Sequence, residues 1–367
     1  MATKKYLVTL TPHNKFFFGG EKTLGTDNQN YLVESRYFPQ QTSVLGFIRY
    51  QLLVQSNDDK IFKNNKIQDD GKAKKLIGKS GFTIGNTTGY GKIKSLSPVF
   101  IVDKNAGNNG DKFYFPGNKE YQTQKKYEDN CILKEENVFV EPVKINNNQK
   151  QLETGKPLIK LEKYDPKFDL YDFLLNKKGD RKTYDEIFTE HKQVGIRKNY
   201  EGKTDEKAYF VQTYRKMKNG YAFGFIVELD DFDLKSKEVV IFGGEQQAFK
   251  MEVTEFDDDL ENFFPNYKPS KNFNKIVLVS DTYVEKDVID QFDFAITETA
   301  DFRFMETKTG GHNYHQVNKS KKYNLYKKGS VFYFDGDKNN LITSTFNKDD
   351  FKNIGYNHYK IINKNNQ

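Results

Sequence analysis

The segment Tyr221-Ala-Phe-Gly-Phe-Ile-Val-Glu-Leu229 decides the fold class of this chain. Its first, third, fifth, seventh and ninth residues are all large and apolar, the alternation typical of a β-strand with one face on a core. A second strand is predicted over Ala208–Met217, and the turn Lys218-Asn219-Gly220 separates the two. A short glycine-containing connection predicts that these strands pair as an antiparallel hairpin.

The same criteria predict more strands than helices. Strands are expected over Lys5–Leu10, Lys92–Val102, Lys112–Phe115, Lys250–Glu255, Lys275–Val279, Phe292–Thr297 and Ser330–Phe334. The clearest helix is Val44–Leu53, whose N-terminus Thr42 or Ser43 could cap. Other helices are expected over Asp169–Leu175, Thr183–His191, Glu285–Phe292 and Lys348–Ile354. Because helices do not alternate strictly with strands, the predicted class is α+β with antiparallel sheets.

The chain has 367 residues, which suffices for about two domains. We expect the boundary near residue 190, giving an N-terminal domain 1–190 and a C-terminal domain 191–367. Residues from about Lys104 to Lys182 are polar and rich in lysine and asparagine, which predicts insertions and a linker region rather than core. The 32 Phe and 23 Tyr can nevertheless fill sizeable cores, so full disorder is excluded.

Cysteine content and apolar runs indicate where the protein works. Cys131 is the only cysteine, so the chain has no disulfide framework and no multi-thiolate metal site, which fits a reducing compartment. The apolar run near the N-terminus is interrupted by Thr9 and Pro12, too early for a signal peptide, and no run approaches the length of a membrane span. We therefore expect a cytoplasmic protein without a membrane anchor.

The positive charge consists mostly of lysine. Lys and Arg number 58 against 51 Asp and Glu, for a net charge of +7. The only arginines are Arg36, Arg49, Arg181, Arg197, Arg215 and Arg303. Lysine is a strongly hydrated point charge, whereas the arginine fork binds phosphate at two points. Most lysines are therefore expected to be solvated surface residues, and the arginines become candidates for specific contacts.

The histidines do not form a recognisable catalytic or metal-binding pattern. His312 and His315 could contribute two ligands to a metal, but no third ligand is apparent nearby. His13, His191 and His358 are isolated, without the Ser, Cys or carboxylate partners of a catalytic triad. We therefore predict no catalytic residue, no metal and no cofactor.

Glycine pairs form the one constellation that points to a ligand. The pairs are Gly19-Gly20, Gly243-Gly244 and Gly310-Gly311, each beside positive or polar residues. Paired glycines after a strand let backbone amides approach an anion closely. The segment Ser35–Pro39 contains Arg36 and leads into the helix start at Thr42-Ser43, where further amides can face a phosphate. Together these features predict phosphate binding.

These residues also carry a family resemblance. Pro12–Gly20 and Ser35–Arg49 resemble the opening of repeat-associated (RAMP) proteins of CRISPR systems. The later motifs are Gly91–Pro98, Val194–Arg197, Phe242–Glu245 and Lys328–Tyr333. In this order they resemble the family formed by the third subunit of type III-B Cmr effector complexes, across nearly the whole chain. One departure is Gly244-Glu-Gln-Gln247, which lacks a glycine and an arginine that relatives tend to have, and with them one expected phosphate contact.

The resemblance implies two ferredoxin-like (RRM-related) domains and a non-catalytic function. The family binds the 5′ handle of the CRISPR RNA, caps one end of the ribonucleoprotein, and bridges the large polymerase-like subunit to the backbone subunits in antiviral defence. The predicted RNA-binding residues are Lys15, Gly19, Gly20, Lys22, Arg36, Thr42, Ser43, Arg49, Arg197, Lys198, Lys203, Gly243, Gly244 and Gln246. Of these, Arg197, Lys198 and Lys203 are expected in a thumb-like hairpin.

Several alternatives stay open at the level of sequence. The chain could instead be a metal-independent CRISPR RNA-processing endoribonuclease of the same superfamily, with His13 or His191 as the base. An aromatic-rich surface or glycan-binding protein is a third class, which the missing signal peptide disfavours. Arg49 could form a helix-surface ion pair, and Arg197–Lys203 could be a solvated turn. The rings of Phe263–Tyr267 could either contact the large subunit or close the core of the second domain.

Overall fold

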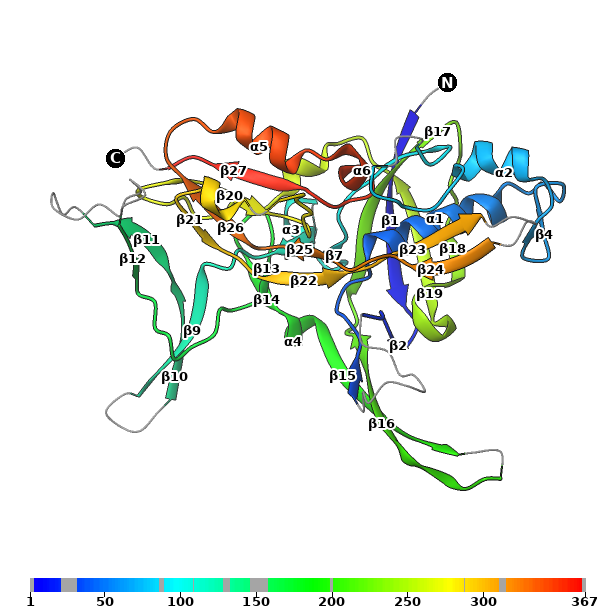
Figure 1. Ribbon diagram of the computed structural model, residues 1–367, viewed down its shortest axis with the longest axis horizontal. Helices are drawn as coiled ribbons and strands as arrows, with labels where there is room; N and C mark the ends of the chain where they lie inside the picture. Colours follow the sequence, from blue (N-terminus) through cyan, green and yellow to red (C-terminus); the bar gives the residue numbers. More distant parts are fainter. Residues whose placement is uncertain are drawn as a thin grey trace.

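The fold is built around one large antiparallel sheet (Figure 1). The computed structural model describes residues 3–20, 32–85, 89–107, 109–127, 133–145, 158–198, 201–286, 288–309 and 315–364. Within these ranges the large sheet has nine strands in the order β14-β13-β8-β7-β17-β1-β19-β18, and β6 also pairs with β17. Its strands are β1 (Thr3–Pro12), β6 (Ile93–Leu96), β7 (Phe100–Asp103), β8 (Phe113–Pro116), β13 (Phe173–Leu175), β14 (Arg181–Thr183), β17 (Tyr221–Asp230), β18 (Lys237–Ile241) and β19 (Ala248–Glu255).

A second sheet and several hairpins surround the large one. The second sheet has the order β21-β26-β20-β27, formed by β20 (Asn274–Leu278), β21 (Phe294–Ile296), β26 (Val331–Phe334) and β27 (Tyr359–Ile362). A third sheet consists of the long hairpin of β15 (Phe188–Lys198) and β16 (Thr204–Met217), with β2 (Lys15–Phe16) and β3 (Leu32–Glu34) on its edge. The remaining strands form two-stranded sheets, namely β4 (Phe62–Lys63) with β5 (Lys66–Ile67), β9 (Tyr121–Tyr127) with β10 (Leu133–Phe139), β11 (Glu141–Lys144) with β12 (Ile159–Glu162), β22 (Thr299–Phe302) with β25 (Tyr323–Tyr326), and β23 (Met305–Thr309) with β24 (His315–Lys319).

Helices are short and few in the part of the chain that the structure describes. They are α1 (Gln41–Gln55), α2 (Asp70–Ile77), α3 (Asn109–Lys112), α4 (Tyr184–Ile187), α5 (Asn339–Phe346) and α6 (Asp349–Lys352), with 3₁₀ turns η1 (Gly244–Gln246), η2 (Leu260–Phe263) and η3 (Ile289–Gln291). Of the strand pairings named here, only that between β3 and β16 is parallel. The predicted α+β class with antiparallel sheets is therefore confirmed. No described helix has the length and apolarity needed to cross a membrane.

Strand β17 shows why the large sheet forms. Its alternate residues Phe223, Phe225 and Val227 pack in one core cluster with Val8 of β1 and Ile48 of α1. The residues between them face the other side, where they meet a second cluster that contains the rings of β8. Both faces are therefore buried, whereas the alternation predicted one buried face. The strand is apolar on both sides because the sheet lies between two layers of packed side chains.

The predicted hairpin of Ala208–Met217 with Tyr221–Leu229 is wrong. Both segments are strands, but β16 pairs with β15, β2 and β3, whereas β17 pairs with β1, β6 and β7. Strand β1 occupies one edge of β17 over eight residue pairs, and β7 and β6 share the other edge. No edge of β17 is left for β16, so the intervening turn leads the chain from one sheet to another.

Other local predictions also need correction. Lys92–Val102 contains two strands, because Pro98 lacks the N–H that a continuous ladder requires. Asp169–Leu175 is not a helix, since β13 lies there between β8 and β14. Helix α4 covers only the first turn of Thr183–His191, and the described residues of Glu285–Phe292 contain only η3. The sequence patterns gave no prediction for α2, α3 or α5.

Residues between Lys104 and Lys182 contribute to the core, which corrects the prediction that they are only insertions and linker. Phe113 and Phe115 of β8 are fully buried in the large sheet, and Phe173 of β13 is nearly so. The hairpins β9–β10 and β11–β12 do project from the body as insertions would (Figure 1). The large sheet thus contains strands from both sides of residue 190, near which we expected a domain boundary.

The rings of Phe263–Tyr267 lie inside the molecule. Phe263 and Phe264 are buried in the cluster that covers one face of the large sheet. Tyr267 is buried with strands of the second sheet, and its hydroxyl donates to the carbonyl of Pro116 at 3.0 Å. Of the two roles considered for these rings, the structure therefore supports core packing.

Candidate nucleic-acid interface

Three predicted RNA-binding segments meet at one pocket, which we call the glycine pocket. It has a volume of about 320 Å³. Its lining residues are Phe18, Gly19, Pro39, Gln40, Ser43, Phe47, Tyr50, Ile241, Phe242, Gly243 and Gly244. The N–H of Gly244 donates to the carbonyl of Phe17 at 2.9 Å, and the N–H of Arg36 donates to the carbonyl of Phe18 at 2.9 Å. The first of these bonds connects segments that lie more than 200 residues apart in sequence, and the second connects Arg36 to the nearby loop at Phe18.

The loop at Gly243 needs glycine for its backbone conformation. Gly243 has φ of 84°, and a Cβ there would lie 3.0 Å from the carbonyl oxygen of Phe17. Glu245 and Gln246 follow with φ of 56° and 53°. The Glu245 carboxylate accepts from Gln212 Nε2 at 2.8 Å and from the hydroxyl of Tyr214. Its negative charge is thus held at β16, and Glu245 does not line the glycine pocket.

The start of α1 differs from the prediction. The N-cap is Gln40, which makes no side-chain cap bond, so neither Thr42 nor Ser43 caps the helix. The backbone amides of Gln41 and Thr42 lie near the hydroxyl of Tyr356. Ser43 donates its N–H to the carbonyl of Gln40 at 2.9 Å. The amide of Ser43 therefore has a partner inside the protein, and its exposed side chain lines the pocket together with Gln40.

Two predicted cations flank the segments that form the pocket. A Cβ added to Gly20 would lie 3.2 Å from Nε of Arg36, so Gly20 leaves room for the guanidinium. Lys15 lies on β2, where its Nζ donates to Gln193 Oε1 at 2.7 Å and sits 4.0 Å from the centroid of the Tyr214 ring. Lys15 is thereby fixed at the base of the β15–β16 hairpin.

The predicted thumb-like hairpin is present. Figure 1 shows β15 and β16 projecting from the body of the molecule. Lys198 and Lys203 are exposed near its tip, and Lys203 Nζ lies 3.0 Å from Glu201 Oε2. The side chain of Arg197 lies outside the described residues. Lys22, the Gly310-Gly311 pair and Cys131 also lie outside the described residues.

Arg49 does not join the other predicted residues. Its Nε–H donates to the carbonyl of Ile77 at 2.9 Å, at the end of α2. Burial lowers the pKa of its guanidinium. Arg49 thus connects α1 to the last turn of α2, where it satisfies a helix-end carbonyl instead of forming a surface ion pair.

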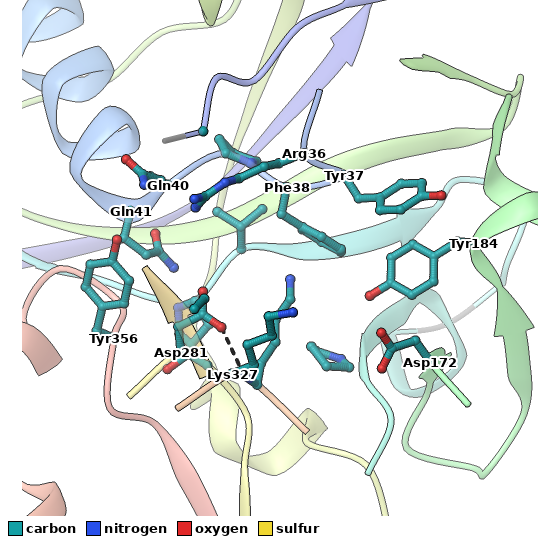
Figure 2. A pocket seen from close by; sticks show the side chains of 18 of the residues that line it. Arg36, Tyr37, Phe38, Gln40, Gln41, Asp172, Tyr184, Asp281, Lys327 and Tyr356 are labelled. Atoms are coloured by element: carbon teal, nitrogen blue, oxygen red, sulfur yellow. Dashed lines mark hydrogen bonds between the residues drawn. The ribbon is translucent and has the colours of Figure 1, made fainter. Parts of the chain in front are cut away.

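A cavity larger than the glycine pocket lies between loops of the large sheet and loops of the second sheet, and we call it the junction cavity (Figure 2). Its volume is about 690 Å³. Arg36 reaches into it from the side opposite Asp281 and Lys327, and Tyr184 directs its hydroxyl toward the interior (Figure 2). Lys328 also lines it, and burial lowers the pKa of this lysine to about 8. We did not predict Lys328 or Tyr356 as site residues, although Lys328 opens one of the motifs that carry the family resemblance.

The histidines that the structure describes contact other parts of the protein or lie on its surface. His13 Nε2 lies 2.9 Å from the carbonyl oxygen of Glu238. His191 is exposed on β15, opposite Tyr214. His312 and the side chain of His315 lie outside the described residues. Within the described ranges, no group of three or more His, Cys, Asp or Glu residues is arranged to hold a metal ion.

His358 makes stability depend on pH. Burial lowers the pKa of its imidazole to about 4, from an ordinary value near 6.5. Between these values the unfolded chain binds a proton that the folded chain does not, so the free energy of unfolding falls as pH is lowered from 7 to 4. We expect a loss of about 2–3 kcal/mol from this group. Urea unfolding of wild type and His358→Gln at both pH values measures it, and an equal pH dependence in the two proteins would contradict the assignment.

The α+β fold and a pocket formed by glycine loops beside an arginine are features expected of a RAMP protein of CRISPR systems. The family model for CRISPR-associated protein (Cas_Cmr3) matches residues 8–364. The chain therefore belongs to this family, and the resemblance to the third subunit of type III-B Cmr complexes is confirmed. A comparison with curated proteins gives no match.

The chain is also similar to chains in solved structures. One is a cryo-EM structure of the Type III-B Cmr-beta bound to cognate target RNA, with 12% identity and a TM-score of 0.47 over 97% of this chain and 96% of that one. A second, of Cmr-beta bound to cognate target RNA and AMPPnP, gives 12% identity and a TM-score of 0.43 over 96% and 95%. The apo state of Cmr-beta gives 12% identity and a TM-score of 0.27 over 70% and 98%.

Proposed function

We propose that this protein is a non-catalytic RNA-binding subunit of a type III-B CRISPR (Cmr) ribonucleoprotein in antiviral defence, and that it binds the 5′ handle of the CRISPR RNA. The observation that carries the proposal is the meeting of Gly19, Ser43 and the Gly243-Gly244 loop in one pocket, with Arg36 beside Gly20. Glycine loops let an RNA backbone approach the protein backbone closely, and a guanidinium binds phosphate at two points.

Other groups near the glycine pocket are available to the bases and further phosphates of a bound RNA. Tyr50 lines the glycine pocket and is 41% exposed, which leaves its ring open to a splayed base. Lys15, Lys198 and Lys203 follow the hairpin from its base to its tip. Their charges supply the sequence-independent attraction that single-stranded RNA binding requires.

Two ferredoxin-like units are supported by strand order. Along the chain, β1, β7, β17 and β19 are four strands whose spatial order in the large sheet is second, third, first and fourth. The same order describes β20, β21, β26 and β27 of the second sheet. Helix α1 follows the first strand of one unit, and α5 precedes the last strand of the other. These are two crossover positions of a βαββαβ unit.

This interpretation moves the domain boundary. The first unit ends with β19 at Glu255 and the second begins with β20 at Asn274. The boundary we propose therefore lies in residues 256–273, and the β15–β16 hairpin belongs to the first unit. Limited proteolysis followed by mass spectrometry tests the position, since a stable fragment that begins near residue 190 would favour the original prediction.

The proposed partners are the large polymerase-like subunit and the backbone subunits of the complex, in the cytoplasm. Exposed apolar side chains available to them include Val194 and Ile196 on β15 and Val239 and Ile241 on β18, each 49–61% exposed. Isolated exposed apolar residues are ordinary, but pairs of them on one strand suit an interface. Co-expression with the large subunit and size exclusion without RNA tests direct contact, and separate elution of the two folded proteins would argue against it.

The RNA proposal predicts a specific charge effect. Arg36→Glu combined with Lys15→Glu should weaken binding of handle RNA by about 10–100-fold at moderate salt, because two attractive phosphate contacts become repulsive. Fluorescence anisotropy against salt concentration measures the effect. The slope of log affinity against log salt should also become shallower by about 0.7 per lost contact.

The matched control reverses two exposed lysines, Lys75→Glu on α2 and Lys79→Glu just after it, and should change affinity much less. An equal loss of RNA affinity in both double variants would indicate that RNA is attracted by overall charge and not by this site. Cleavage of repeat RNA by the purified protein in EDTA, abolished by His191→Ala or His13→Ala, would overturn the non-catalytic assignment in favour of the endoribonuclease.

A further inference from the structure

Of the four cations that line the junction cavity, Arg36 and Lys328 lack an ion pair with any residue that the structure describes. The other two are paired: Lys119 Nζ lies 2.8 Å from Asp172 Oδ1 and 2.7 Å from Glu298 Oε2, and Lys327 also pairs with Glu298. Within the described ranges, no carboxylate forms an ion pair with Arg36 or Lys328. The cavity therefore holds two positive groups whose charge the neighbouring side chains do not neutralise by contact.

The surroundings of Lys328 make this unusual. Its Nζ lies 3.2 Å from the centroid of the Phe38 ring, so an aromatic face rather than a carboxylate holds the ammonium. The Asp281 carboxylate accepts from the backbone N–H of Lys328 at 2.9 Å instead. A desolvated cation without a paired anion is costly, and an anionic ligand would relieve that cost.

A buried acceptor in the same cavity is the second observation. Gln41 is only 6% exposed and lines the cavity. Its Nε2 donates to the carbonyls of Ser97 and Gly355 at 3.3 and 3.2 Å. Within the described residues, its Oε1 is buried without a hydrogen-bond partner. A buried carbonyl oxygen of this kind is a place for a donor from a ligand.

The size and walls of the cavity suit one nucleotide. Its volume of about 690 Å³ falls in the range of small-ligand sites, roughly 300–1,000 Å³. Tyr37 and Tyr184 contribute aromatic surface, with their ring centroids 4.5 Å apart. Cations for a phosphate, an acceptor for an amine or hydroxyl, and aromatic walls are thus present together.

We propose that the junction cavity binds one nucleotide, with its phosphate held by Arg36 and Lys328 and with an amine or hydroxyl of its nucleoside donating to Gln41 Oε1. The proposal rests on the proposed function where the nucleotide belongs to bound RNA, and a free mononucleotide is the other source of the same chemistry. Arg36 precedes α1 of the first unit and Lys328 precedes β26 of the second, so the ligand would bind both units at once.

The test uses the full-length protein with AMP, inorganic phosphate and a single-stranded RNA decamer as separate probes in calorimetric titrations. Lys328→Gln should weaken AMP binding by at least about 10-fold, since one charged hydrogen-bonding partner is removed. Lys328→Arg should retain most of the affinity. Lys321→Gln is the matched control, because Lys321 also lies over a ring, that of Tyr323 at 5.0 Å, but does not line the cavity.

The outcomes separate the possibilities. Loss of AMP and phosphate binding in Lys328→Gln, with an unchanged melting temperature and an unchanged Lys321→Gln, supports the proposal. Competition between RNA and AMP then identifies a nucleotide of RNA as the source, and simultaneous binding identifies a free mononucleotide. A wild type that binds AMP but not RNA would remove the proposed function and leave this inference intact. The proposal would be overturned if Lys328→Gln bound AMP and RNA as tightly as wild type does. It would also be overturned if wild type bound no AMP and Lys328→Gln bound RNA as tightly as wild type.

Discussion

Replacing Glu120 by alanine should lower the free energy of unfolding by about 3–5 kcal/mol, because it leaves a buried ammonium without its counter-ion. Glu120 and Lys275 are both fully buried, and Lys275 Nζ lies 2.6 Å from Oε1 and 2.7 Å from Oε2 of the carboxylate. Asn118 Nδ2 and the Tyr333 hydroxyl also donate to this carboxylate. Burial lowers the pKa of Lys275, so the site disfavours the charged ammonium when its carboxylate is absent.

The position of this pair explains the size of the effect. Glu120 precedes β9 in the segment that sequence patterns indicated to be an insertion, and Lys275 lies on β20 in the middle of the second sheet. The pair therefore fixes the projecting hairpins to the second sheet. Breaking it removes hydrogen bonds to one carboxylate as well as one ion pair, so the loss exceeds that of an ordinary surface bridge.

Urea unfolding measured on single and double variants tests this prediction. Glu120→Leu combined with Lys275→Met should recover most of the stability lost in Glu120→Ala, because apolar replacement removes both charges. Glu252→Ala is the control, since its pair with Lys104 is partly exposed and should contribute less than about 1 kcal/mol. A loss under about 1 kcal/mol in Glu120→Ala would show that water or rearrangement compensates the lysine.

Strand existence could be predicted from sequence, whereas strand pairing could not. Alternation along Tyr221–Asp230 reports burial of side chains and is local, so β17 was found. The glycine turn before β17 is also a local signal, but which strand pairs with β17 depends on competition among all strands. β1 lies more than 200 residues away, and its eight residue pairs with β17 exclude β16. The residues of a turn carry no information about strands so distant in the sequence.

The candidate site shows the same division. The glycine loops and Arg36 became candidates because glycine and arginine carry special backbone or hydrogen-bonding properties wherever they occur. The N-terminus of α1 was misjudged because the hydroxyl that lies beside it, that of Tyr356, comes from a segment about 300 residues further along the chain. Lys328 is one of 52 lysines, and it became a site candidate only when the fold placed it over Phe38, although it opens a family motif.

Gly355 is where these distant segments meet, and Gly355→Ala should cost about 2–5 kcal/mol from backbone strain and overpacking. Gly355 has φ of 92°, and a Cβ would lie 2.4 Å from the carbonyl oxygen of Ser97 and 2.6 Å from Gln41 Nε2. The obstacle at Ser97 is backbone, so it cannot rotate away. Because Gly355 O accepts from Gln41 Nε2, a shift here also displaces the start of α1 beside the glycine pocket.

Thermal and urea unfolding of Gly355→Ala measure the loss, and handle-RNA anisotropy on the fraction that stays folded should show weaker binding. Gly46→Ala provides the matched control. Gly46 lies inside α1 and is exposed, with nothing within 4 Å of its Cβ position, so alanine there should stabilise the helix by about 0.5–1 kcal/mol. If Gly355→Ala proves as stable as wild type, the contact between the start of α1 and the segment before β27 is looser than the structure indicates. A Gly355→Ala protein that loses stability but binds RNA with wild-type affinity would instead show that the glycine pocket forms without this support.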